Sequence, residues 1–71
     1  SFTAPADGTL IVTAGSASAG NAREYVVVDA TGTEQTKSVD APEDKEFDIV
    51  AGDVLIYPKA GIRFYKFQYK P

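Results

Sequence analysis

The sequence predicts an all-β fold, a compact antiparallel β-sandwich of about six to seven short strands. No stretch of the chain carries apolar residues at the spacing of an amphipathic helix. Short runs rich in β-branched and aromatic residues recur instead, and Gly, Pro or Asp turn signals separate them. The 71 residues are enough for one domain, so we expect a single module over residues 1–71.

The N-terminal part of the chain predicts two strands and a loop. Residues 1–3 form the end of a first strand, which a proline and an Asp-Gly turn close. The run TLIVTA over residues 9–14 predicts a strand whose alternate side chains share one face. Residues 15–25 contain Gly, Ser and Ala without an apolar stripe, which predicts a loop.

A β-hairpin is predicted in the middle of the chain. The run YVVVD over residues 25–29 is β-branched, and we interpret it as a central strand covered on both faces. A tight turn follows at residues 30–32, where Gly32 can supply a positive φ. Residues 33–39, TEQTKSV, return as a polar strand and are therefore expected at the edge of a sheet.

Three strands are predicted after a loop over residues 40–44. The run KEFDIV over residues 45–50 alternates cleanly, which places its phenylalanine and isoleucine on the inner face. An Ala-Gly turn leads into residues 53–58, and a Lys-Ala-Gly turn leads into the last strand, residues 62–69.

The last strand does not fit strict alternation. Ile62 and Phe64 would share one face, while Tyr65, Phe67 and Tyr69 would lie on the other. Two explanations are open: both faces are partly covered, or a β-bulge near the Phe64-Tyr65 pair shifts the register.

Most aromatic residues are expected in the core, because the chain has no Trp and no Met to fill it. The phenylalanines predicted to be buried are Phe2, Phe47, Phe64 and Phe67. Tyr65 is predicted to join them, with its hydroxyl at the rim of the core.

The charge is unevenly distributed along the chain. Residues 1–53 carry three cations against ten acids, whereas residues 54–71 carry four cations and no acid. These four are Lys59, Arg63, Lys66 and Lys70. The acidic net charge of −3 disfavours binding to nucleic acid, and no apolar run is long enough to span a membrane. We therefore expect neither nucleic acid nor membrane as a partner.

The composition argues against catalysis. The chain has no His and no Cys, which removes disulfides, thiolate metal sites and the commonest catalytic base. A pair of carboxylates could serve a glycosidase, but so small a sandwich offers little depth in which to raise a carboxyl pKa. We expect no enzyme activity and no cofactor. A structural calcium ion near the acidic turns is an open alternative.

The skeleton FTAPADGTLIVTA … YVVVDATGTE … FDIVAGDVLIYPKAGIRFYKFQY covers most of the chain. It resembles the small, jelly-roll-like β-sandwich modules attached to gut-bacterial polysaccharide lyases, especially pectate lyases. The elements that carry the resemblance lie at residues 2–9, 29–32, 51–53 and 61–69. The chain is shorter than common jelly-roll modules. The resemblance implies a non-catalytic carbohydrate-binding module that tethers a covalently linked catalytic domain to plant cell-wall pectin. It also implies a secreted or cell-surface location.

Candidate ligand-binding residues follow from the charge, the rings and the resemblance. Lysines that hold galacturonate carboxylates are implied by the resemblance, and Arg63 could bind a carboxylate through two hydrogen bonds. Exposed tyrosines could stack on the apolar face of a sugar ring. The candidates are Lys59, Arg63, Lys66, Lys70, Tyr57, Tyr65, Tyr69 and, in the loop that could line a cleft, Arg23.

Other readings of the same residues are open. Lysines on an edge strand also discourage aggregation, and tyrosine rings also fill cores. The chain could be a structural or interaction domain without a sugar ligand, which acts as a spacer or packs against a neighbouring domain. It could also be a fibre subunit that accepts strands at an exposed edge.

Overall fold

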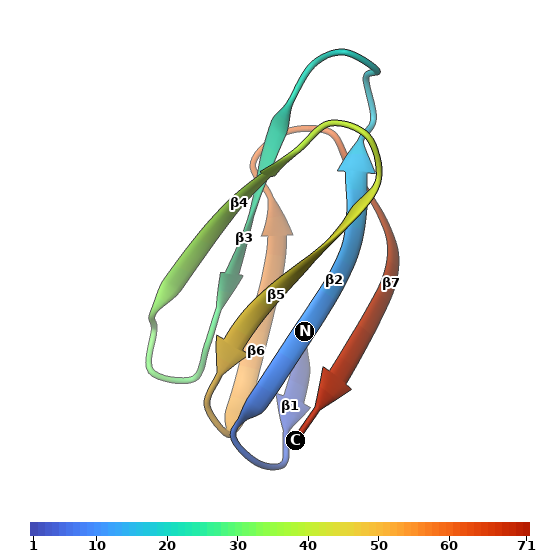
Figure 1. Cartoon of the computed structure of the whole chain (residues 1–71). Helices are drawn as coiled ribbons and strands as arrows, with labels where there is room; N and C mark the ends of the chain where they lie inside the picture. Colours follow the sequence, from blue (N-terminus) through green and yellow to red (C-terminus); the bar gives the residue numbers. More distant parts are fainter.

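The computed structural model describes all 71 residues and confirms an all-β fold without helices (Figure 1). No segment therefore qualifies as a membrane-spanning helix. The seven strands are β1 (Phe2–Ala4), β2 (Gly8–Ser16), β3 (Arg23–Val28), β4 (Glu34–Val39), β5 (Glu43–Ile49), β6 (Gly52–Pro58) and β7 (Ile62–Lys70).

The strands form two antiparallel sheets that pack face to face as a β-sandwich. One sheet has the order β1-β6-β3-β4 and the other the order β5-β2-β7. In Figure 1 the three-stranded sheet lies in front of β6, and β1 lies beside the lower end of β6. As predicted, β3 is an interior strand and the polar β4 is an edge strand.

The core lies between the two sheets and is built from alternate side chains of the strands. Tyr25 is fully buried at its centre, and its ring meets the rings of Phe47 and Phe64 edge-on at centroid distances of 5.8 and 5.4 Å. Burying a large apolar side chain stabilises a fold by about 1.5–3 kcal/mol. The other large side chains that are fully buried are Leu10, Val12, Val26, Val27, Val39 and Val54.

The hairpin between β3 and β4 forms as the sequence predicts. Gly32 has a φ of +83°, and its amide donates to the carbonyl of Asp29 over 2.9 Å. The Asp29 carboxylate accepts hydrogen bonds from the Thr31 amide, the Thr31 hydroxyl and the Thr33 amide. These hydrogen bonds stabilise the turn. They also lower the pKa of Asp29, with the Thr31 hydroxyl as the main cause.

A β-bulge interrupts the ladder between β2 and β7 near the Phe64-Tyr65 pair, as one of the two explanations offered for the last strand requires. Lys66 pairs with Thr13 and Phe64 with the adjacent Ala14, so Tyr65 has no partner on β2. The explanation by a bulge is therefore confirmed.

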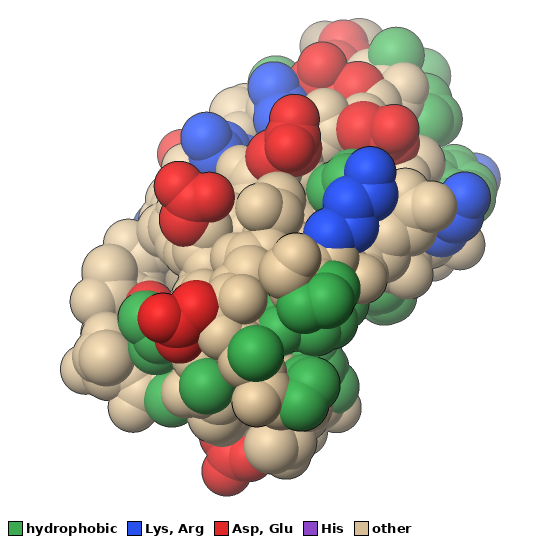
Figure 2. Space-filling view, turned by 60° about the horizontal axis from the view of Figure 1, so that its bottom comes forward, with side chains coloured by type: hydrophobic (Ala, Val, Ile, Leu, Met, Phe, Trp, Pro, Cys, Tyr) green, Lys and Arg blue, Asp and Glu red, His purple; other side chains and the backbone are tan.

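Hydrophobic side chains also reach the surface. Phe67 is 50% exposed and Tyr65 is 56% exposed, so the prediction of a buried position is wrong for both. Tyr65 is displaced because the bulge leaves it outside the alternation of β7. Figure 2 shows several groups of hydrophobic side chains at the surface of the face that it presents.

Candidate functional site

The outer face of β7 gathers most of the C-terminal charge. Leu10, Val12 and Ala14 of β2 point into the core, so their β7 partners Tyr69, Phe67 and Phe64 share the inner face. The intervening residues of β2 point outward. Their partners on β7 are Arg63, Lys66, Gln68 and Lys70, opposite Gly15, Thr13, Ile11 and Thr9. We call these four β7 residues the basic column.

The cations of the basic column are exposed and free of ion pairs. Successive rows on one face of a sheet are roughly 6.7 Å apart, so the column extends over about 20 Å. The ion pairs of the chain join Lys45 to Glu43 and Lys59 to Glu24, and neither involves Arg63, Lys66 or Lys70. Unpaired cations in one line can each contact an anion without first breaking an internal contact.

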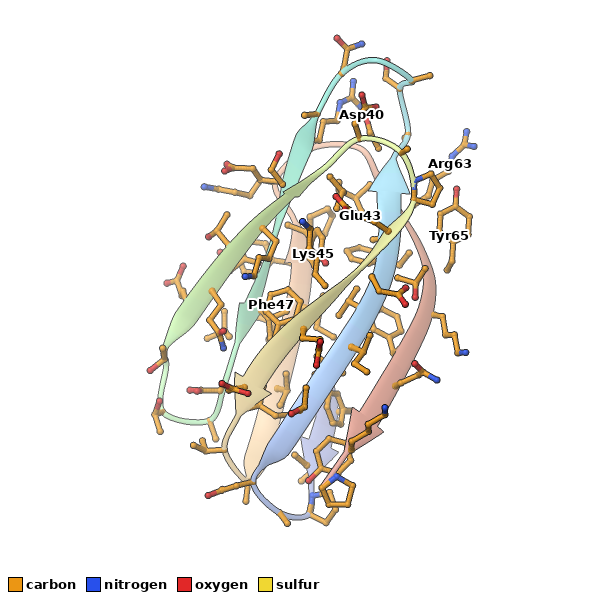
Figure 3. All side chains as sticks on the ribbon, in the orientation of Figure 1. Asp40, Glu43, Lys45, Phe47, Arg63 and Tyr65 are labelled. Atoms are coloured by element: carbon orange, nitrogen blue, oxygen red, sulfur yellow. The ribbon has the colours of Figure 1, made fainter.

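The bulge adds a ring beside the basic column. Figure 3 shows Tyr65 and Arg63 projecting from β7 on the same side, away from the sandwich. Tyr65 is 56% exposed, so its ring face is open to a ligand. Tyrosine offers an apolar face with a polar tip, which suits contact with a sugar ring.

An acidic column lies on the same face of the sheet, on the far side of β2. It consists of Asp44, Glu46 and Asp48 of β5, which pair with Thr13, Ile11 and Thr9. Neighbouring strands are about 4.8 Å apart, so the acidic and basic columns are separated by about 10 Å. This distance is close to the Debye length of about 10 Å at 0.1 M salt, so the two columns influence one another mainly at low salt.

Two of the candidate residues, Lys59 and Tyr57, do not lie on the face that carries the basic column. The Lys59 ammonium lies 3.8 Å from the Glu24 carboxylate, and its amide donates to the Glu24 carbonyl. Tyr57 pairs with Val26 on the outer face of the four-stranded sheet. Both residues belong to β6 or its following turn, and β6 is in the sheet opposite β7.

Arg23 and Tyr69 are also separate from the basic column. The Arg23 guanidinium donates to the Gly61 carbonyl over 3.4 Å, at the turn between β6 and β7. Tyr69 points inward, where its ring lies 6.1 Å from that of Phe2 and its hydroxyl donates to the Ala6 carbonyl. The ring of Tyr69 therefore packs between β1 and β7.

The face has the chemistry of an anion-binding surface. No three carboxylates come together in a group that could hold a metal ion. Burial raises the pKa of Tyr25 to about 12, with a smaller contribution from the Glu43 carboxylate, but this hydroxyl lies inside the sandwich. What the outer face offers is a line of cations, an amide at Gln68 and the ring of Tyr65.

Comparison of the chain with protein-family models, with curated proteins and with solved structures finds no match.

Sequence reasoning missed the acidic column. The alternation of β5 signals that Glu46 and Asp48 point outward, because Phe47 points inward. No local feature of the sequence indicates that β5 and β7 lie on either side of β2. That arrangement depends on sheet order, which brings together residues that are distant in sequence.

Proposed function

We propose that the protein is a non-catalytic carbohydrate-binding module that holds an acidic plant polysaccharide, of the pectin or homogalacturonan type, along the outer face of β7. The observation that carries the proposal is the basic column, with three exposed and unpaired cations on one face. The resemblance of the sequence to accessory modules of pectate lyases implies the same class of ligand, an acidic plant polysaccharide.

Each residue of the column has a distinct role in the proposed contact. Arg63 presents a planar guanidinium that can bind a uronate carboxylate through two parallel hydrogen bonds. Lys66 and Lys70 act as point charges toward further carboxylates of the same chain. Gln68 lies between them in register and can hydrogen-bond sugar hydroxyls, while Tyr65 packs on a ring.

The acidic column sets the direction of the polymer. A polyanion that crossed the sheet from β7 to β5 would approach Asp44, Glu46 and Asp48, and like charges repel. A polymer that runs along β7 meets the cations and keeps the acids at about 10 Å. Binding along the strand is therefore favoured over binding across it.

The proposed role is to target a linked enzyme. Individual exposed ion pairs contribute only about 0–1 kcal/mol, so the affinity of one module would be modest. A modest site is sufficient to raise the effective concentration of a covalently linked catalytic domain near its substrate. Such a module acts outside the cell, secreted or at the cell surface, where plant polysaccharide is found.

Affinity electrophoresis tests the proposal. The protein is run through native gels containing polygalacturonate, highly methyl-esterified pectin or a neutral glucan, and each mobility is divided by that in a ligand-free gel. We expect retardation by polygalacturonate alone, because esterification removes the carboxylates. Added salt should weaken the retardation, since exposed charges are screened.

A matched pair of variants locates the site. Lys66→Ala and Lys59→Ala remove the same charge from different surfaces, because Lys59 is paired with Glu24 on the other sheet. Lys66→Ala and Arg63→Ala should each reduce retardation, and Lys59→Ala should not. Equal effects of Lys59→Ala and Lys66→Ala would mean that net charge alone controls mobility, and would contradict a site on β7.

A structural or interaction domain without a sugar ligand is the second candidate. It is favoured by exposed apolar side chains away from the basic column, since Leu55 is 49% and Phe67 is 50% exposed. Equal relative mobility in all three gels would favour this alternative.

A further inference from the structure

The outer face of the three-stranded sheet carries opposite charges on its two sides. β2 lies between β5 and β7 (Figure 1), so the acidic column is on one side of β2 and the basic column is on the other. The outward residues of β2 between the two columns are neutral, namely Thr9, Ile11 and Thr13. Because each of them pairs with a residue on both neighbouring strands, each defines a row across the sheet.

Each row ends in an acid on β5 and in a lysine or an amide on β7. The row ends are Asp44 with Lys66, Glu46 with Gln68, and Asp48 with Lys70. The acids and the lysines are exposed, and none of them is in an ion pair of the chain. The two ends of a row are about 10 Å apart, which is too far for direct contact. The charges on this face therefore lack partners within the chain.

The Asp44 carboxylate is oriented by a neighbour on the same face. The Thr13 hydroxyl donates a hydrogen bond to it. A carboxylate offers two oxygens with about four lone-pair sites, so Asp44 can still accept hydrogen bonds from an ammonium group. A side chain that is already held in place loses less conformational freedom when it binds a partner.

A two-fold axis parallel to β2 makes this face complementary to itself. Rotation about that axis carries the acidic column of one copy over the basic column of the other and leaves every row at the same height. Asp44 of each copy then faces Lys66 of the other, and Asp48 faces Lys70. In a two-fold contact each pair occurs twice, so these two pairs give four ion pairs.

The geometry of packed sheets is compatible with this axis. Sheets that pack face to face are about 10 Å apart, a distance that a lysine and an aspartate from opposing faces span together. Rotation about the central strand also carries the twist of one sheet onto the other, so the spacing stays even across the face. An axis that ran across the strands would instead place acids over acids and lysines over lysines, and like charges repel.

We propose that two copies of the protein associate through the outer faces of their three-stranded sheets, about a two-fold axis parallel to β2. The contact covers three strands and three rows, an area of roughly 300 Å² per copy. A stable complex buries about 800 Å² on each side. We therefore expect a weak and reversible association, with a dissociation constant on the order of 1 mM.

Self-association covers the basic column. A second copy and the acidic polymer therefore exclude one another on this face, a consequence that rests on the proposed function. The association itself does not rest on it, because the ion pairs form between two copies of the chain without any sugar.

Sedimentation equilibrium of the protein at about 1 mM tests the association. We expect the weight-average mass to exceed that of one copy at an ionic strength of about 0.1 M. At about 1 M it should fall to the mass of one copy, because the Debye length shortens from about 10 Å to about 3 Å.

Charge reversal identifies the residues that meet. Lys66→Glu places an acid opposite Asp44 in both contacts of the dimer, and Asp44→Lys places a lysine opposite Lys66. Each variant alone should associate at least about tenfold more weakly than the original protein, because like charges then face each other. An equimolar mixture of the two variants should associate again, because opposite charges meet in both contacts of the mixed dimer.

A matched pair on the other sheet controls for net charge. Lys59→Glu and Glu34→Lys make the same changes of charge at exposed positions that belong to or follow strands of the four-stranded sheet. Each of these variants should associate as the original protein does, and mixing them should add nothing.

Three outcomes would overturn the inference. The first is an original protein with the mass of one copy at both ionic strengths. The second is a mixture of Lys66→Glu and Asp44→Lys that associates no better than either variant alone. The third is equal weakening by Lys59→Glu and Lys66→Glu, which would show that net charge alone controls the association. None of these measurements contains polysaccharide, so a loss of retardation by polygalacturonate is a separate result that concerns the proposed function.

Discussion

Arg63 and Lys66 lie on the same face of β7 although three positions separate them in the chain. An odd separation places two residues of a regular strand on opposite faces. The bulge at Tyr65 absorbs the extra residue, so the alternation resumes in the phase that keeps the lysine outside and Phe67 inside. The basic column exists because of this single irregularity.

Deletion of Tyr65 should therefore preserve the fold. Without it, the remaining residues of β7 alternate inward and outward in the order that the structure already has. We expect urea unfolding to give an unfolding free energy that differs from that of the original protein by less than about 1 kcal/mol, as for a mild surface substitution. Retardation by polygalacturonate should fall only by the contribution of the lost ring.

Deletion of Gln68 is the control. It removes a residue from the regular part of β7, so either Tyr69 or Phe67 must exchange faces with a lysine. A register change of this kind exposes a ring and buries a charge, and we expect loss of cooperative unfolding by circular dichroism. If both deletions are equally harmful, the bulge is not a removable insertion.

Much of the fold could be predicted because its signals are local. The Gly32 turn, the inward positions of Phe47 and Ile49 and the bulge near Phe64-Tyr65 each follow from a few adjacent residues. The exposure of Phe67 does not. It depends on the groove that Phe67 shares with Phe2 and Ile56, which are distant from it in sequence.

The candidate site was predictable in part for the same reason. The cations on β7 share a surface because one strand carries them and because the bulge, which the broken alternation of that strand signals, keeps Arg63 and Lys66 on one face. Lys59 is only a few residues upstream, yet the turn before β7 leaves it with β6 in the opposite sheet, beside Glu24. Proximity in sequence did not predict proximity in space where the chain crosses between sheets.

The Asp29 turn predicts an acid dependence of stability. Hydrogen bonds hold the folded-state pKa of Asp29 below its ordinary value. A lowered pKa stabilises the fold at pH values above about 3.9, the ordinary value, and this contribution is lost as the pH falls through the folded-state pKa. Asp29→Asn should therefore show a smaller loss of unfolding free energy between pH 5 and pH 2 than the original protein.

The Thr31 hydroxyl is the main cause of this shift and can be removed separately. A titration of the Asp29 carboxyl carbon by NMR should show a higher pKa in Thr31→Val than in the original protein. Thr36→Val, on β4 outside the turn, should leave the titration unchanged. An unchanged pKa in Thr31→Val would show that the backbone amides alone hold the carboxylate.

Gly52 predicts a steric effect at the start of β6. Its φ is +119°, and a Cβ atom built on it would lie 2.6 Å from the Cβ of Ala30. We expect Gly52→Ala to lower the unfolding free energy by about 2 kcal/mol or more, from backbone strain and overpacking together. Gly20 is the control, because it has a φ of +82° but no atom within 4 Å of an added Cβ. Gly20→Ala should cost about 1 kcal/mol, and equal losses would contradict a steric role for Ala30.

Tyr25 predicts a gain in stability and a change at high pH. Its hydroxyl is buried without a hydrogen-bond partner, and burial raises its pKa to about 12. An unpartnered buried hydroxyl is costly, so Tyr25→Phe should leave the unfolding free energy unchanged or raise it by about 1 kcal/mol.

The raised pKa means that the unfolded chain releases the phenolic proton near pH 10, whereas the folded chain retains it to about pH 12. Ionisation of Tyr25 therefore costs the fold nothing below about pH 10, and the unfolding free energy falls as the pH rises toward 12.

Urea unfolding of both proteins at pH 8, 10 and 11 measures this difference. The other tyrosines and the lysines titrate in both proteins, so the difference between them isolates Tyr25. We expect the advantage of Tyr25→Phe to grow from pH 8 to pH 11. A ring that kept its hydroxyl satisfied by a bound water would give the opposite result at pH 8, where Tyr25→Phe would then be the less stable protein.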